Sequence, residues 1–220
     1  RSYSLSACLA AVVALSAPAF ATEVTMETPF GDVRIELFDE QTPATVANFL
    51  KYVNSGAYAN SFIHRSVPGF VIQGGGYYLV EGAPNAIETF PPVVNEPGIS
   101  NVRGTIAMAK RSGDPNSATS QWFFNLVDNS EGLDDNNGGF TVFGQVLGNG
   151  MDVIDEIADL QVWNAAAPFN ELPLIGYPGV GEITEENLVM IDMMSDGNSN
   201  GFNINPGLND AWYNLETDGQ

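Results

Sequence analysis

The stretch that most restricts the possible folds of this chain covers residues 61–77 and reads SFIHRSVPGFVIQGGGY. Its two apolar runs, at 62–63 and 70–72, have the length of strands and flank Pro68-Gly69, a pair typical of turns between strands. The glycines at 74–76 favour a strand end where the backbone passes close to a neighbour or a ligand. The stretch therefore predicts two paired strands.

Short apolar runs of the same kind recur along most of the chain, separated by residues that favour turns. Regularly spaced short strands with few helices are typical of a closed antiparallel barrel or a sandwich, so a mainly β fold is expected. The further strands that this pattern predicts lie at residues 23–28, 33–38, 105–109, 122–127, 141–147 and 188–194.

Two segments carry helical signals instead. Thr42-Pro43 offers a hydroxyl N-cap and a proline at the first helical position, and apolar residues then follow at helical spacing up to Gly56. A shorter helix is expected over residues 152–158. Residues 81–100 and 160–187 contain many turn residues and are predicted to be loops.

The charge of the chain is large and unevenly distributed. The 220 residues carry a formal charge of −20, and after Arg111 there is no Lys or Arg, whereas 18 of the 27 acidic residues fall there. Such a surface repels nucleic acid and anionic membranes, which bind proteins through phosphate neutralisation. The simpler interpretation is an acidic face exposed to solvent, and the more specific alternative is a surface that binds divalent cations.

Both ends of the chain differ in composition from the part between them. Residues 1–21 form an apolar run that ends in an A-x-A site, which predicts a secretory signal peptide and a periplasmic or secreted protein, without membrane contact after cleavage. The segment around Cys8, the only cysteine, resembles a lipoprotein processing box, but its apolar run follows the cysteine instead of preceding it. Residues 22–194 form the expected domain.

Residues 195–220 form an Asn/Gly/Asp-rich tail or the start of a further module. Within it, residues 196–201 match the first half of a calcium-binding loop, D-x-[DN]-x-[DN]-G. The acid required at the twelfth position is absent, because Gly207 stands there. A linker is therefore preferred over a calcium site.

Most catalytic chemistries lack their residues in this sequence. With one histidine and no cysteine after the signal peptide, a zinc or iron site of the usual ligands is not expected. There is no Gly-x-Ser-x-Gly elbow and no phosphate-binding loop. Rotation about an X–Pro bond needs no nucleophile, metal or cofactor, and an arginine beside an apolar pocket can assist it by hydrogen-bonding the prolyl nitrogen as the amide twists.

Three ordered motifs give the chain a recognisable likeness. Residues 62–75 (FIHRSVPGFVIQGG), 104–124 (beginning GTIAMA and ending SQWFF) and 142–144 (VFG) resemble the signatures of the cyclophilin family of peptidyl-prolyl cis-trans isomerases, and the resemblance covers residues 23–194. It implies a closed eight-stranded antiparallel β-barrel capped by two helices, in a bacterial exported form. It also implies isomerase activity (EC 5.2.1.8 class) on X–Pro bonds in exported proteins, without a cofactor.

The same resemblance implies the roles of individual residues. Arg65 is the catalytic guanidinium that hydrogen-bonds the prolyl nitrogen, with Phe70 and Gln73 beside it. Alternatively, Arg65 is a surface ion-pair partner, Phe70 is a core aromatic and Gln73 caps a strand end. His64 is interpreted as structural. The residues expected to bind substrate are Val71, Ala109, Lys110, Gln121, Phe123, Leu133 and Phe140.

Four positions depart from the family pattern. Val71 stands where methionine is common, Trp122 replaces a phenylalanine, Gly132 stands where animal members often carry tryptophan, and Phe140 replaces a histidine. The barrel and the chemistry should survive these changes, but cyclosporin is expected to bind weakly.

The expected partners are proline-containing polypeptides, and the protein is expected to be a monomer that binds no nucleic acid. A non-catalytic peptide-binding or chaperone module is the main alternative, although a pure binder would not need Arg65. A surface-anchored structural protein organised by its acidic tail is the third possibility, favoured by composition alone.

Overall fold

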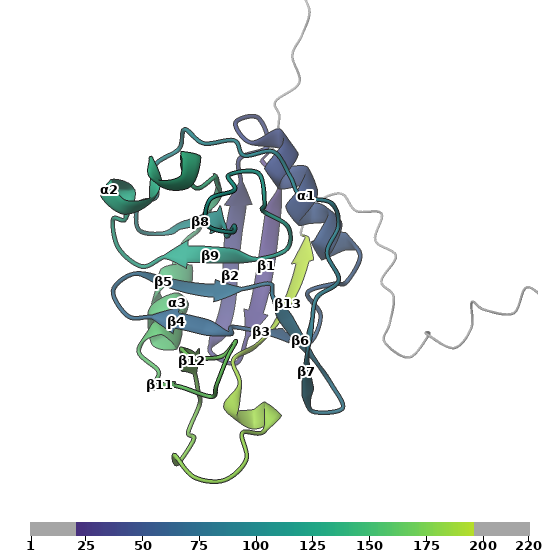
Figure 1. The fold of residues 1–220 in the computed structure, drawn as a ribbon, viewed down its shortest axis with the longest axis vertical. Coiled ribbons are helices and arrows are strands. Elements are labelled where there is room, and N and C mark those ends of the chain that lie inside the picture. Colours follow the sequence, from purple (N-terminus) through teal and green to yellow (C-terminus); the bar gives the residue numbers. More distant parts are fainter. Residues whose placement is uncertain (1–20, 196–220) are drawn as a thin grey trace, which may run out of the picture.

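The computed structural model describes residues 21–195 (Figure 1). The predicted signal peptide and Asn/Gly/Asp-rich tail, including the half calcium loop at 196–201, lie outside the described residues except for Ala21 and Ser195. No helix in the described part is long and apolar enough to cross a membrane.

Strands dominate the described chain. The strands are β1 Glu23–Thr28, β2 Gly31–Leu37, β3 Ser61–Phe62, β4 Arg65–Val67, β5 Val71–Gly74, β6 Tyr77–Val80, β7 Ala83–Ala86, β8 Thr105–Met108, β9 Trp122–Asn125, β10 Val142–Val146, β11 Val162–Trp163, β12 Leu172–Pro173 and β13 Met190–Ser195. The helices are α1 Pro43–Asn54, α2 Ser130–Leu133 and α3 Gly150–Ala158, with short 3-10 turns at Asn136–Gly138 and Glu185–Asn187.

The main sheet curls so far that one stretch of chain borders both of its ends. Its strand order is β4-β5-β9-β8-β10-β2-β1-β13-β3, extended by the β6-β7 hairpin. Only Ile63 and His64 separate β3 from β4, and the amide of Ile63 donates to the Val189 carbonyl while that of His64 donates to the Gln73 carbonyl. Counting β3 and β4 as one strand gives an antiparallel circuit of eight, which confirms the predicted barrel.

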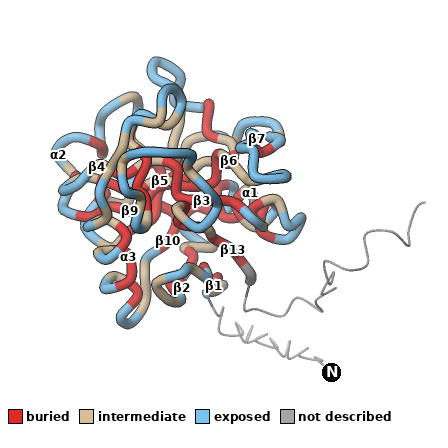
Figure 2. The backbone as a smooth tube through the Cα atoms, turned by 90° about the horizontal axis from the view of Figure 1, so that it is seen from below, coloured by how far each residue is buried: buried red, intermediate tan, exposed pale blue. Residues whose placement is uncertain are grey.

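The interior of the barrel is a closed apolar core. Side chains alternate between the two faces of a strand, so on β9 Trp122 and Phe124 point inward and are fully buried. Of the two longer helices, α1 packs against β13 and α3 against β2. Figure 2 accordingly shows buried residues in the central strands and exposed residues in the surrounding loops.

The glycines after β5 make room for the core. A Cβ on Gly75 would lie 2.5 Å from the Ser120 carbonyl oxygen and 2.7 Å from Nε1 of Trp122, and Gly75 has a φ of +73°. A Cβ on Gly74 would lie 2.6 Å from carbon atoms of the same indole. The close backbone approach predicted for residues 74–76 is therefore confirmed, and the neighbour is the tryptophan ring of β9.

The N-terminus of α1 differs from expectation. The hydroxyl of Thr42 does not cap the helix but donates to the Phe38 carbonyl at 3.3 Å. The carboxylate of Glu96 caps it instead, accepting from the amides of Ala44 at 3.2 Å and Thr45 at 2.8 Å. A carboxylate suits a helix N-terminus because it complements the helix dipole and the unpaired amides.

Both segments predicted as loops contain strands. Within 81–100, residues Ala83–Ala86 form β7 and pair with β6 despite Pro84, because β7 lies at the edge of the sheet. Within 160–187, β11 pairs with β12. The second segment packs onto the barrel through a cluster centred on Phe62, Leu172 and Leu174.

Candidate active site

The functional side chains lie in one row across the outer face of the sheet. Residues directly opposite in antiparallel strands point to the same face. In the register of β4, β5 and β9, Arg65 lies opposite Gln73, and Gln73 lies opposite Phe123. The row continues through Ala107 on β8 to Val142 on β10.

The residues expected to form the apolar pocket cluster in the middle of this row. Val71, Phe123 and Leu133 are buried there together with Ala107 and Val142, in a cluster separate from the barrel core. The partly buried members of the cluster are Phe38, Phe70, Ile99, Ala109 and Phe140. The rings of Phe123 and Phe140 meet edge to face, with centroids 5.9 Å apart. Aromatic and aliphatic side chains therefore gather at the place expected for the pocket.

A buried amide network supports the wall formed by α2. Asn129, at the start of α2, donates to the Phe70 carbonyl at 3.0 Å and to Oδ1 of Asn125 at 2.8 Å. Asn101 donates to Oδ1 of Asp134 at 3.0 Å and to the Phe140 carbonyl at 3.1 Å. Because buried amides must find partners, this network fixes the loop positions of the pocket.

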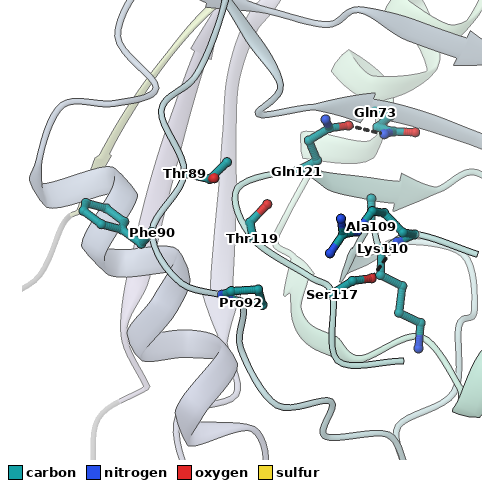
Figure 3. Close-up of a pocket in the computed structure, with 10 residues that line it drawn as sticks. Gln73, Thr89, Phe90, Pro92, Ala109, Lys110, Ser117, Thr119 and Gln121 are labelled. Atoms are coloured by element: carbon teal, nitrogen blue, oxygen red, sulfur yellow. Dashed lines mark hydrogen bonds between the residues drawn. The ribbon is translucent and has the colours of Figure 1, made fainter. Parts of the chain in front are cut away.

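The polar end of the row is a chain of hydrogen bonds. Arg65 Nη1 donates to Oε1 of Gln73 at 3.4 Å, and Nε2 of Gln73 donates to Oε1 of Gln121 at 2.7 Å, the bond drawn in Figure 3. On its other side, Arg65 Nε donates to Oε2 of Glu171 at 2.7 Å. The guanidinium thus lies between a carboxylate and the amide oxygen that faces the pocket.

His64 lies beneath this chain and stays neutral. Burial lowers its pKa to about 4, opposed by a hydrogen bond with Gln121, while the charge of Arg65 lowers it further. Its ring meets Tyr77 edge to face at 5.1 Å. A buried, neutral imidazole behind the glutamine agrees with the structural role expected for His64.

The side chain of Lys110 does not face the pocket. Its ammonium donates to the carbonyls of Asn137 and Gly139 and to Oδ1 of Asn95, and it lies 4.7 Å from the ring centroid of Phe140. Figure 3 shows it pointing away from Gln73 and Gln121. Burial lowers the pKa of Lys110. Any substrate contact of this residue therefore falls to its backbone, as the family resemblance implies.

A cavity of about 400 Å³ adjoins the polar end of the row (Figure 3). Its walls come from β5, the loop between β8 and β9 and the segment after β7, and they include Gln73, Phe90, Ala109, Ser117 and Gln121. The cavity shares Gln73 and Gln121 with the hydrogen-bonded chain. Ala109 belongs both to the cavity wall and to the apolar cluster, so the two adjoin.

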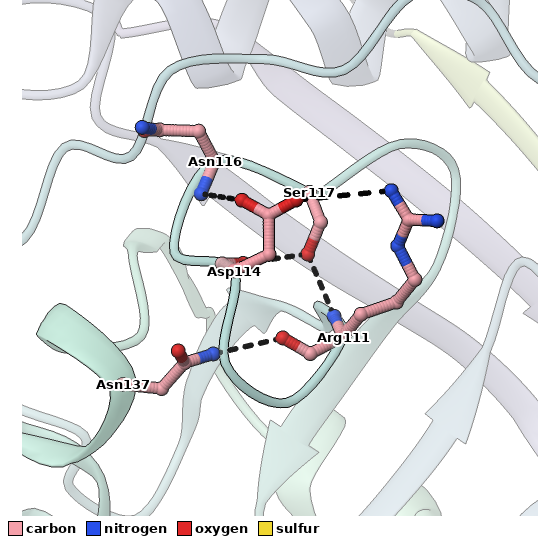
Figure 4. Close-up of polar contacts among 5 residues, drawn as sticks. All are labelled: Arg111, Asp114, Asn116, Ser117 and Asn137. Carbon is pink, nitrogen blue, oxygen red and sulfur yellow. Dashed lines mark hydrogen bonds and ion pairs between the residues drawn. The ribbon is translucent and has the colours of Figure 1, made fainter.

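The loop that borders this cavity is held by its own hydrogen bonds (Figure 4). The Arg111 amide donates to Oγ of Ser117 at 2.8 Å, and that hydroxyl donates to the Asp114 carbonyl at 2.7 Å. Asn137 reaches across to the Arg111 carbonyl at 2.9 Å. The cavity wall is thereby connected to the turn beside Phe140.

The structure brings the predicted site residues together, with Lys110 present through its backbone. Sequence reasoning missed Ala107 and Val142, although Ala107 alternates with Ala109 in the same motif and could have been found. It also missed Glu171, which lies 106 residues from Arg65 in a segment without a motif. Within residues 21–195, no group of three or more His, Cys, Asp or Glu could hold a metal ion.

Comparisons with known proteins agree with this architecture. The family model "Cyclophilin type peptidyl-prolyl cis-trans isomerase/CLD" matches residues 23–176. The chain is 41% identical over 179 residues to peptidyl-prolyl cis-trans isomerase A of Dickeya dadantii (strain 3937), covering 76% of this chain and 90% of that protein. It is 44% identical over 140 residues to peptidyl-prolyl cis-trans isomerase B of Escherichia coli (strain K12), covering 61% and 82% respectively.

Solved structures show the same fold. A cyclophilin type peptidyl-prolyl cis-trans isomerase of Cryptosporidium parvum superposes with a TM-score of 0.59 at 23% sequence identity, covering 81% of this chain and 99% of the other. The chain therefore belongs to the cyclophilin-type peptidyl-prolyl cis-trans isomerases. Its activity is the cis-trans isomerisation of peptidyl-prolyl bonds, EC 5.2.1.8.

Proposed function

We propose that Arg65 is the catalytic group of this isomerase and that the cluster around Phe123 holds the proline ring. One observation carries the proposal: Arg65 lies in register with Gln73, which in turn lies opposite Phe123, so the guanidinium borders the apolar cluster on the outer face of the barrel. The alternative of a remote surface ion pair does not account for the hydrogen bond to Gln73.

The barrier to X–Pro rotation comes from amide conjugation. As the bond twists, the prolyl nitrogen regains its lone pair and accepts a hydrogen bond from Arg65. That bond is stronger in the twisted state than in either planar isomer, so it lowers the barrier instead of merely binding the peptide. An arginine keeps its charge and planar donor array throughout.

Gln73 has a supporting part in this mechanism. Its amide oxygen accepts from Arg65 while its amide nitrogen donates to Gln121, so both ends of the group are fixed. We assign substrate-chain contacts to Gln121 and to the backbone of Ala109 and Lys110. Phe70, Val71, Leu133 and Phe140 complete the pocket.

The substrates are proline-containing polypeptides in exported proteins, and the protein itself is periplasmic or secreted. The apolar run at 1–21 with its A-x-A site supports the export of the chain. The Cryptosporidium relative has also been solved in the presence of the dipeptide Ala-Pro, which supports a pocket for proline in this fold.

The test is a protease-coupled isomerisation assay on a short proline peptide. Arg65→Ala should lower kcat/KM by about 10²-fold or more, the usual effect of removing one donor to a transition state, while the far-UV spectrum and Tm stay close to wild type. Arg34→Ala, which removes another exposed arginine from a different part of the sheet, should retain full activity. Full activity in Arg65→Ala would contradict the role of this residue.

A further inference from the structure

We propose that Glu171 is a positioning residue that orients the catalytic guanidinium, a proposal that rests on the role assigned to Arg65. The two side chains form an ion pair through a single donor: Nε of Arg65 lies 2.7 Å from Oε2 of Glu171. Arg65 also donates through Nη1 to Gln73. A guanidinium held at these two points cannot rotate about its long axis without breaking a contact.

The mode of pairing leaves the reactive edge available. A guanidinium carries five N–H donors, and a carboxylate that takes two of them side by side would block its outer edge. Here the contact of Glu171 is with Nε, on the stem side, and Gln73 takes Nη1. Within the described part of the chain, the guanidinium of Arg65 makes no other hydrogen bond, so its remaining N–H donors are available to a ligand.

Glu171 is itself held in place by the backbone. Its carbonyl accepts from the Ser66 amide at 2.8 Å, so the residue is docked against β4 next to Arg65. Leu172, which follows Glu171, is buried in β12. Phe169 precedes Glu171 by two residues, and the centroid of its ring lies 5.8 Å from that of Phe62 and 4.9 Å from that of Tyr77. The carboxylate is thus presented by a packed segment and not by a loose loop.

Exposure indicates what this ion pair is for. The side chains of Arg65 and Glu171 are 36% and 44% exposed, and ion pairs this accessible add little to stability. Charge alone would also oppose catalysis, since a carboxylate weakens the field of the guanidinium at the prolyl nitrogen. The benefit of the pair is therefore geometric: it holds the donor where the twisted amide needs it.

The experiment compares Glu171→Ala with Glu171→Gln in the isomerisation assay, with kcat and KM separated. Glu171→Ala should lower kcat about tenfold with little change in KM, because misplacing a catalytic group by an ångström costs up to ~10²-fold. Glu171→Gln retains an oxygen acceptor for Nε and should keep most of the activity. An unchanged or increased kcat in Glu171→Ala, or an equal loss in both variants, would overturn the proposal.

A matched control is available in another exposed arginine pair, Arg103–Asp155. Asp155→Ala removes the negative charge that pairs with Arg103. The side chains of Arg103 and Asp155 are each 45% exposed, which is similar to the pair at Arg65, and this variant should leave kcat unchanged. Equal kcat losses in Asp155→Ala and Glu171→Ala would show that the loss comes from the change in net charge and not from the positioning of Arg65. Tm measurements must show that all variants are folded at the assay temperature.

A readout independent of catalysis separates this proposal from the proposed function. In a ¹⁵N spectrum, the Nε–H signal of Arg65 should be protected from exchange in wild type and in Glu171→Gln, and lost in Glu171→Ala. Full activity in Arg65→Ala, with this signal intact in wild type, would contradict the proposed function alone. An active wild type without a protected signal would contradict the role of Glu171 alone.

Discussion

The two faces of β5 and β9 use similar residues for opposite purposes. On the inner face, Ile72 and Phe124 are fully buried in a core that surrounds them on all sides. On the outer face, Val71 and Phe123 are almost as buried, but their cluster is bordered by the partly exposed Phe70, Phe140 and Arg65. Burial alone therefore does not distinguish core from site; the difference lies in what surrounds the buried side chains.

The largest expected effect separates two adjacent phenylalanines. Phe124→Ala should lower the free energy of unfolding by about 3–5 kcal/mol, because the cavity it leaves is enclosed, yet its folded fraction should keep normal kcat/KM. Phe123→Ala should cost less stability, since its cluster opens to solvent, but should lower kcat/KM about tenfold through loss of proline contact. Denaturant titration with parallel activity assays measures both.

Equal activity losses in the two variants at full folding would remove the distinction between the faces. Measurements should be made where both variants are folded, because Phe124→Ala unfolds first on heating or in denaturant.

The next effect concerns pH. Burial lowers the pKa of His64 from the usual value near 6.5 to about 4, so the unfolded chain binds a proton before the folded chain does. The free energy of unfolding is therefore not reduced by His64 above pH 6.5, and it falls by about 3 kcal/mol as the pH drops toward 4, because protonation of His64 favours the unfolded chain. Denaturant unfolding near pH 7 and about pH 4.5 should show this loss in wild type.

His64→Gln provides the comparison, because it removes the titrating group while keeping a polar side chain beside Gln121. Its stability should fall less steeply over the same pH range, with the remaining slope due to carboxylates. Identical slopes in wild type and variant would show that His64 does not titrate as its burial requires.

The smallest effect is on inhibitor binding at the rim of the outer pocket. Wild type is expected to bind cyclosporin weakly, since Val71 and Gly132 replace larger residues typical of the family. A Cβ on Gly132 meets nothing within 4 Å, so Gly132→Trp has room at its Cβ, whereas Val71→Met enlarges a buried side chain and its folding is checked by Tm. The double variant should bind cyclosporin about tenfold more tightly, equivalent to ~1.4 kcal/mol, as measured by inhibition of isomerisation.

Tight, stoichiometric inhibition of the wild-type enzyme would contradict this prediction. Unchanged inhibition of the folded double variant would place the cause of weak binding elsewhere, with Phe140 as the next residue to exchange.

Local patterns predicted a mainly β fold and the two longer helices, because strand and helix periodicity are local properties of the sequence. The resemblance of three motifs to the cyclophilin family implied the closed barrel and the site residues. Local patterns failed where the partner is distant. The cap of α1 comes from Glu96, and the anion beside Arg65 comes from Glu171; neither carboxylate lies in a pattern that marks it. Thr42 stands at the N-cap position and Pro43 begins the helix, as predicted, but the hydroxyl of Thr42 does not cap the helix because the fold supplies the carboxylate of Glu96.

The position of β13 has a consequence for how the enzyme becomes active. This last strand lies between β1 and β3 and not at an edge, so residues 190–195 complete a ring begun at residue 23. A growing chain lacks this closing strand until residues 190–195 have been made, and β3, which leads into Arg65, then lacks its partner. The chain must therefore extend through residue 195 before the barrel that carries the site can close.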